Sequence, residues 1–114
     1  MSKDAIEYLK HIRDECSYIL SVITTETCKD DFMSDETLKR AVIRSLEIIG
    51  EASKKIPADI KVQWDTIKWK NMAGLRDRLI HDYMGVNYSI VWDVVKNKTP
   101  ELYNQIVEVI EKEQ

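Results

Sequence analysis

The hydrophobic positions of the chain recur at steps of three and four, a spacing that places them on one side of an α-helix. The first stripe lies within residues 5–23, and charged residues separate its members. It consists of Ala5, Leu9, Ile12, Cys16, Ile19, Leu20 and Ile23. We therefore expect a long amphipathic helix here. Three threonines follow it, and Lys29-Asp30-Asp31 then favours a loop.

A second stripe predicts another long helix, which ends before Pro57. Its members are Leu38, Val42, Ser45, Ile49, Ala52 and Ile56, and Ala41, Ile43, Leu46 and Ile48 widen the apolar surface. Ser34 is the expected N-cap residue. A helix that is apolar on more than one side suits the core and a second subunit. Gly50 costs about 1 kcal/mol relative to alanine, so we expect another helix to pack closely there.

The second half of the chain predicts shorter helices. Residues 57–64 suit a helical turn, and a third long helix should begin between residues 65 and 70 and end near Asp82. Gly85 is expected to end that helix, and Asn87 to cap the next. Thr99-Pro100-Glu101 predicts a restart with threonine as the cap. The inward positions are Met72, Leu75, Leu79 and Ile80, then Val91, Trp92 and Val95, then Leu102, Ile106, Val109 and Ile110.

These patterns describe one all-α domain over residues 1–114, packed as a four- to five-helix antiparallel bundle. The 114 residues include 3 glycines and 2 prolines, too few for the many turns of an all-β protein. The net charge of −3 argues against general binding of long nucleic acids. With two cysteines, no Cys-x-x-Cys and two histidines, we expect no metal site and no cofactor. The absence of an apolar signal or membrane-length run favours a cytoplasmic protein.

Candidate chemistry is concentrated in residues 76–83. Asp77 and His81 are four apart, so they share a helix face, where the carboxylate could orient the imidazole. His81 lies near the helix C-terminus, whose partial negative charge favours the protonated ring. Arg76 offers a fixed positive fork suited to phosphate. A histidine that moves protons and an arginine that stabilises charge are what metal-independent RNA cleavage by the 2′-hydroxyl requires.

The local charge agrees with an RNA site. Residues 61–78 carry five basic side chains against two acidic ones, a net charge of +3. Lys70 and Arg78 are therefore possible RNA contacts. An isolated Arg-x4-His pattern is nevertheless common, and a structural histidine is its usual explanation. Arg76 and His81 also lie about 140° apart around an ideal helix. Either the helix breaks near His81, or two copies of the chain combine to form the site.

The ordered motifs resemble a known family. Arg76-x4-His81-x-Tyr83 is similar to the Arg-x4-His-x-Tyr motif of HepT toxins, a branch of the HEPN superfamily. The segments 49–52 (Ile-Gly-Glu-Ala), 72–77 (Met-Ala-Gly-Leu-Arg-Asp) after Trp69, and Val91-Trp92 also resemble the family, as does the restart at Pro100. The resemblance covers residues 38–102. Asp77 stands where the family more often has asparagine, which adds a negative charge near the phosphate site.

The resemblance implies a function and its partners. It implies a HEPN-type bundle that forms a homodimer with both motifs facing one cleft, and Arg76 and His81 as the catalytic pair of an endoribonuclease. It further implies the toxin of a type VII toxin–antitoxin system. The antitoxin would be an MntA-like nucleotidyltransferase that transfers AMP from ATP to Tyr83, which would block the RNA site by bulk and charge.

Several alternatives stay open at this point. The chain could be a non-catalytic HEPN partner that binds RNA, a nucleotide or a nucleotidyltransferase, or, less favoured, a purely structural dimer. Glu51 could support the site or be a solvated surface residue. The tryptophans favour core or dimer contacts over base stacking. His11 is expected to be merely exposed.

Overall fold

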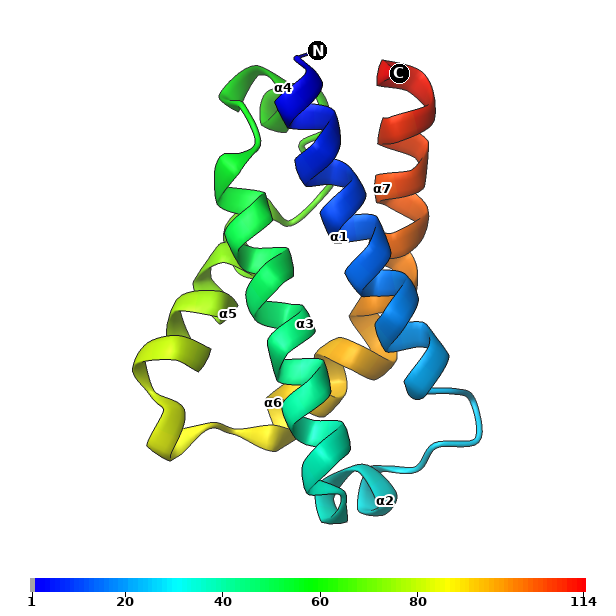
Figure 1. Cartoon of the computed structure of the whole chain (residues 1–114), viewed down its shortest axis with the longest axis vertical. Coiled ribbons are helices and arrows are strands. Elements are labelled where there is room, and N and C mark those ends of the chain that lie inside the picture. The colour runs from blue at the N-terminus through cyan, green and yellow to red at the C-terminus, as the bar shows by residue number, and fades with distance from the viewer. Residues whose placement is uncertain (1) are drawn as a thin grey trace.

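Four long helices form an antiparallel bundle in the computed structural model, which describes residues 2–114 apart from the side chain of Tyr83. They are α1 (Lys3–Val22), α3 (Glu36–Lys55), α5 (Trp69–His81) and α7 (Thr99–Glu113). Helix α3 packs between α1 and α5, and α7 covers the other side of α1 (Figure 1). The predicted all-α bundle is confirmed. Shorter elements connect the long helices: α2 (Lys29–Ser34), α4 (Ala58–Gln63), η1 (Tyr83–Gly85), α6 (Tyr88–Asp93) and η2 (Val94–Lys98).

The predicted hydrophobic stripes form most of the core. In α1 the stripe is buried except for Leu20, which is partly exposed. In α3 the core residues include Val42, Leu46, Ile49 and Ala52. Burial raises the pKa of the Cys16 thiol to about 12, with a smaller contribution from the charge of Glu15. No helix among the described residues is both long enough and apolar enough to cross a membrane.

The three tryptophans contact other parts of the bundle. Trp69 is buried, and its indole N–H donates to the carbonyl oxygen of Trp64 at 3.1 Å. Trp64 in turn donates to a carboxylate oxygen of Glu113 at 3.1 Å. The ring of Trp92 lies 5.4 Å from that of Phe32. The expectation of core contacts is therefore confirmed.

The predicted loop at residues 29–31 is wrong, because these residues begin helix α2. Asp30 and Asp31 lie in its first turn, where negative charge is favourable. Phe32 is fully buried and anchors the helix to the core. The expected N-cap, Ser34, is the last residue of α2. Asp35 caps α3 instead, and its carboxylate accepts a hydrogen bond from the backbone N–H of Leu38 at 3.0 Å.

The last helix begins at Thr99 with Pro100 in its first turn, as predicted, but Thr99 is not its cap, since the backbone stays helical from α6 through the π-helical segment η2 into α7. Thr99 is 1% exposed, and its hydroxyl donates back to the carbonyl oxygen of Val94 at 3.0 Å. It therefore satisfies a carbonyl group inside a continuous helix and does not cap a new one. Pro100 is tolerated because the wide π turn has already displaced the backbone hydrogen bonds.

The connector after α5 differs from the prediction in one detail. Helix α5 ends at His81, within a residue of the expected end, and Asp82 is its C-cap. Gly85 does not end this helix. It closes the following 3-10 turn, in which its N–H donates to the carbonyl oxygen of Asp82 at 2.8 Å. Asn87 caps α6 as predicted, and its side chain accepts from the N–H groups of Ser89 and Ile90.

Helices α3 and α5 cross closely at Gly50, as the sequence predicted. A Cβ atom on Gly50 would collide with the Cβ atom of Arg76 and would lie 2.7 Å from the carbonyl oxygen of Met72. Real Cβ atoms essentially never approach so closely. Ser53, one turn further along α3, is fully buried and bonds the carbonyl oxygen of Ile49. Small residues in α3 thus let the backbone of α5 approach, and they fix the position of Arg76.

Candidate active site

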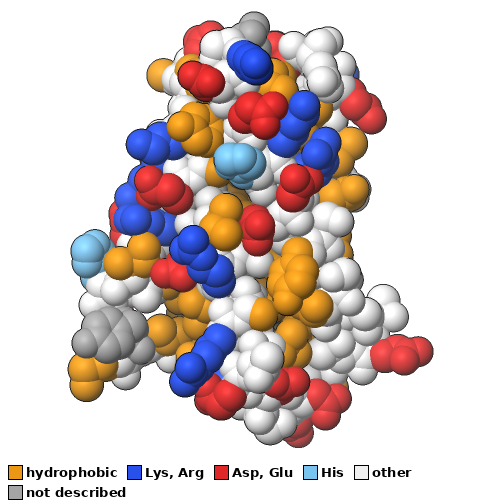
Figure 2. Space-filling view, viewed as in Figure 1, with side chains coloured by type: hydrophobic (Ala, Val, Ile, Leu, Met, Phe, Trp, Pro, Cys, Tyr) orange, Lys and Arg blue, Asp and Glu red, His pale blue; other side chains and the backbone are white. Residues whose placement is uncertain are grey.

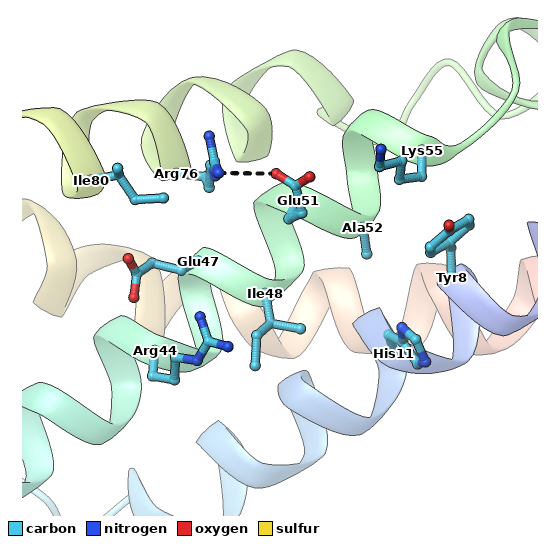
Figure 3. A pocket seen from close by; sticks show the side chains of 10 residues that line it. All are labelled: Tyr8, His11, Arg44, Glu47, Ile48, Glu51, Ala52, Lys55, Arg76 and Ile80. Atoms are coloured by element: carbon cyan, nitrogen blue, oxygen red, sulfur yellow. Dashed lines mark ion pairs between the residues drawn. The ribbon is translucent and has the colours of Figure 1, made fainter.

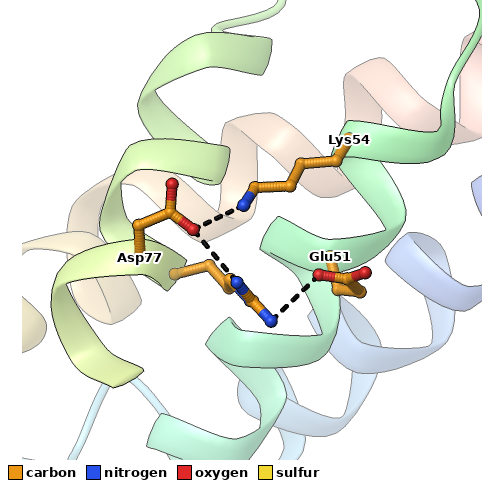
Figure 4. Close-up of polar contacts among 4 residues, drawn as sticks. Glu51, Lys54 and Asp77 are labelled. Carbon is orange, nitrogen blue, oxygen red and sulfur yellow. Dashed lines mark hydrogen bonds and ion pairs between the residues drawn. The ribbon is translucent and has the colours of Figure 1, made fainter. Parts of the chain in front are cut away.

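Arg76 lies at this crossing and is held by two carboxylates. Its side chain is 25% exposed. One terminal nitrogen, Nη2, lies 3.2 Å from a carboxylate oxygen of Glu51 on α3, and the other, Nη1, lies 3.1 Å from Asp77 Oδ1 (Figure 4). The Nε atom is buried and has no hydrogen-bond partner. Each terminal nitrogen carries a second N–H, so the guanidinium keeps donors for a further anion.

Asp77 bonds Arg76 and Lys54. Its Oδ1 atom accepts from the ammonium group of Lys54 at 2.5 Å and from Arg76 at 3.1 Å. These two hydrogen bonds, that of Lys54 first, lower the pKa of the Asp77 carboxyl. The structure gives no hydrogen bond between Asp77 and His81, both of which it describes. Asp77 therefore orients the guanidinium of Arg76, and the predicted contact with the imidazole is not made.

The second long helix supplies half of this ion-pair cluster. The sequence left Glu51 open between a supporting role and a solvated one, and the structure pairs it with Arg76. The sequence pattern did not single out Lys54, which is one helical turn from Glu51 and pairs with Asp77. The available signal was the crossing itself, because a helix that packs at Gly50 brings the neighbouring turns of α3 onto Arg76 and Asp77.

His81 is the last residue of α5 and is exposed. Its imidazole makes no hydrogen bond or ion pair with any residue that the structure describes. Because α5 is unbroken from Trp69 to His81, the five-residue step keeps Arg76 and His81 about 140° apart around the helix. The helix ends only at His81, so no break between the two residues brings their side chains together within one chain.

Of the remaining predicted site residues, Lys70 and Arg78 lie on the outward face of α5, and Tyr83 follows this helix in the sequence. Lys70 and Arg78 are exposed and form no salt bridge with the described residues. Gly74 lies between them, with no atom within 4 Å of a Cβ built on it. The side chain of Tyr83 lies outside the described residues, so its predicted modification stays a prediction. No three His, Cys, Asp or Glu side chains of the described part of the chain gather as metal ligands would.

A shallow hollow of about 200 Å³ opens beside Arg76, between α1, α3 and α5 (Figure 3). Arg76 and Ile80 border it from α5. His11, on α1, is exposed as expected, but it also borders this hollow. This position could not be predicted, since nothing in the spacing of α1 shows which turn of α3 His11 faces.

Comparisons with known proteins show which family the chain resembles. A family model described as Ribonuclease HepT-like matches residues 4–109. The chain is 43% identical to a "Putative RNase" of Caldanaerobacter subterraneus over 93% of this chain and 94% of the relative. It is 44% identical to a "Probable ribonuclease HepT" of Thermococcus cleftensis over 90% of this chain and 92% of the relative. A "Putative RNase" of Methanocaldococcus jannaschii is 44% identical over 95% and 88%. No solved structure gave a significant match.

Proposed function

Because this chain belongs to the family of HepT-like ribonucleases, we propose that it is an endoribonuclease toxin that cleaves RNA without a metal ion. The observation that carries the proposal is the placement of Arg76. The close crossing at Gly50 fixes this arginine at the protein surface, with exposed His81 five residues further along the same helix. Lys70 and Arg78 on the outward face add positive charge for the RNA backbone.

The proposed reaction is an attack by the ribose 2′-hydroxyl on the adjacent phosphorus. A histidine accepts the hydroxyl proton as the new O2′–P bond forms. The P–O5′ bond breaks, and a proton donated to O5′ gives a 5′-hydroxyl end and a 2′,3′-cyclic phosphate. Negative charge accumulates on the phosphate oxygens in the transition state, and the guanidinium of Arg76 is positioned to stabilise it. DNA has no 2′-hydroxyl and is spared.

The proposed site is completed by a second subunit. One chain presents Arg76 and His81 on different sides of α5, so one chain does not surround a single phosphate. In a homodimer whose two α5 helices face a shared cleft, the arginine of one subunit can meet the histidine of the other. Two copies of His81 also supply one group for each of the two proton transfers.

The experiment is RNA cleavage in the presence of EDTA by the wild-type protein and the Arg76→Ala and His81→Ala variants. Loss of one catalytic group should lower kcat by about 10²-fold or more. New ends should be 5′-hydroxyl and cyclic phosphate. Equal activity in all three proteins would refute the assignment. A mixture of the two inactive variants tests the dimer, because a shared site should recover part of the activity in heterodimers.

We further propose that a partner nucleotidyltransferase of the MntA type silences this cytoplasmic toxin by transferring AMP to Tyr83. Tyr83 follows His81 by two residues in the Arg-x4-His-x-Tyr motif, so an added nucleotide would bring bulk and negative charge to the RNA site. Incubation with the cognate transferase and ATP should add one AMP mass per modified residue. An adduct found on Tyr88 or Tyr103 alone would overturn the assignment of Tyr83.

One observation favours a second candidate function, a non-catalytic RNA-binding partner of a nucleotidyltransferase. Both terminal nitrogens of Arg76 are engaged by carboxylates, which weakens the positive charge that a transition state would meet. This function predicts a protein that binds RNA through Lys70 and Arg78 on the outward face of α5 but never generates new 5′-hydroxyl ends. The EDTA cleavage assay distinguishes the two functions directly.

A further inference from the structure

The hollow beside Arg76 has the chemistry of a nucleotide subsite. Its floor is apolar and comes from Ile48 and Ala52 of α3 and Ile80 of α5. Its far edge is aromatic, where the rings of Tyr8 and His11 on α1 meet edge to face with their centroids 6.0 Å apart (Figure 3). The flat face of a base can lie against such a floor and edge, since aromatic side chains stack on every kind of base.

Cations border the same hollow along α3. Arg44 and Lys55 both line it and are exposed, and neither forms a salt bridge with a described residue. They are eleven residues apart, which corresponds to roughly 16 Å along the helix axis. Arg76 lies opposite the part of α3 between them (Figure 3). Charged side chains of both signs, with apolar ones between them, cover this face of the molecule (Figure 2). A backbone that follows α3 would therefore meet three positive groups in succession.

Two carboxylates that can accept hydrogen bonds from a base also line the hollow. Glu51 is held by Arg76. Glu47, one turn earlier on α3, lines the hollow and has no salt bridge with a described residue. A carboxylate accepts hydrogen bonds only, so Glu47 can bond the exocyclic amino group of adenine, cytosine or guanine. Uracil has no exocyclic amino group and offers a carboxylate only its ring N3–H.

We propose that this hollow binds one nucleotide of the RNA strand, the neighbour of the scissile phosphate. The inference rests on the proposed ribonuclease function and adds a subsite to it. The base lies on the apolar floor against Tyr8 and His11, its phosphates lie toward Arg44 and Lys55, and Arg76 forms the boundary with the reacting phosphate. At about 200 Å³ the hollow is smaller than the roughly 300–1,000 Å³ of pockets for drug-sized ligands, which suits one base with its phosphates outside.

The geometry gives the enzyme a preference for sequence context. His81 does not border the hollow, whereas Arg76 does. The bound nucleotide therefore lies on one side of the scissile phosphate only. Base preference should be confined to that one flanking position, and it should favour bases that carry an amino group over uracil.

The test compares Arg44→Ala and His11→Ala with a matched control, Arg40→Ala. Arg40 is an exposed arginine one turn earlier on α3 and does not line the hollow. With a single-stranded oligoribonucleotide in EDTA, each hollow variant should raise KM about fivefold or more, with kcat within twofold of the wild type. The control should change neither. Mapped cleavage sites should lose their preference against uracil in Glu47→Ala. If the hollow variants match Arg40→Ala in KM, the subsite is refuted while the ribonuclease stands.

A binding measurement separates the two proposals. His81→Ala should still bind the same oligoribonucleotide, and adding Arg44→Ala should weaken that binding about fivefold, whereas adding Arg40→Ala should not. Binding that depends on Arg44 without any cleavage by the wild type would refute the enzyme and retain the subsite. Binding that is equal with and without Arg44 and His11 would refute the subsite. The altered arginine and histidine side chains are exposed and Glu47 is partly exposed, so the variants should fold, and circular dichroism verifies this.

Discussion

Gly50 in α3 and Gly74 in α5 both lie in the interior of a long helix, but only Gly50 has a neighbour that requires a glycine. A Cβ on Gly50 would collide with Arg76, whereas a Cβ on Gly74 would meet no atom within 4 Å. Neither glycine has a positive φ angle, so neither is needed for an unusual backbone conformation. In each case the glycine costs the helix about 1 kcal/mol relative to alanine. The close packing of α5 offsets this cost at Gly50, whereas no contact in the described chain offsets it at Gly74.

This comparison separates the two faces of α5. The inner face is fixed by the fold, because it packs on α3 and its arginine is held by Glu51 and Asp77. The outer face carries Lys70, Gly74 and His81, and nothing in the described chain covers it. A costly glycine on an uncovered face is explained if another molecule approaches the helix backbone there, as the second subunit of the proposed dimer would. Arg76 and His81, the proposed catalytic pair, thus depend on different surroundings.

The largest effect is expected from Gly50→Ala. The added methyl group has no space, so α5 must shift, and the free energy of unfolding should fall by about 2 kcal/mol despite the better helix propensity of alanine. Arg76 carries the atom that would collide, so kcat should fall as well. Urea denaturation and the cleavage assay measure the two effects. A variant as stable and active as the wild type would show that the crossing does not position the arginine.

Gly74→Ala is the matched substitution on the outer face and should act in the opposite direction. Nothing obstructs the methyl group, so the free energy of unfolding of the isolated chain should rise by about 1 kcal/mol. If the partner helix approaches at Gly74, dimer formation and cleavage should nevertheless decrease. The measurements are urea denaturation of dilute protein, sedimentation, and kcat. Higher stability with unchanged dimerisation and cleavage would remove Gly74 from the interface.

The same two faces show what the sequence could predict. The helices and their buried stripes follow from hydrophobic periodicity, and the close crossing follows from the cost of Gly50. The contacts of charged side chains do not follow in this way. Spacing along α5 predicted that Asp77 contacts His81, four residues away. The carboxylate bonds Lys54 instead, because this cation on the neighbouring helix α3 competes with His81 for it. Sequence spacing contains no information about that second helix.

Local capping signals were similarly ambiguous where tertiary contacts compete. Ser34 and Asp35 are both good N-cap residues, and the burial of Phe32 extends α2 as far as Ser34, which leaves Asp35 as the cap. Thr99 before Pro100 has the composition of a helix start, yet its side chain is buried and bonds Val94. In both places the packing of a buried side chain determined which of two acceptable local structures was formed.

The smallest effect is expected from Asp77→Asn, at the border between the two faces. The substitution leaves Lys54 and Arg76 without a shared negative charge, so RNA should bind a few times more tightly at low salt, and this gain should shrink as salt is added.

The effect of Asp77→Asn on stability should depend on pH. Because Lys54 and Arg76 lower the pKa of this carboxyl below its ordinary value of 3.8, the ionised group favours the folded state. That contribution is complete above the ordinary value and is lost as the pH falls through the lowered one. Urea midpoints should therefore favour the wild type slightly at pH 7 and converge with those of the variant well below pH 3.8. A difference that is the same at both pH values would mean that the charge on Asp77 contributes nothing to the inner face.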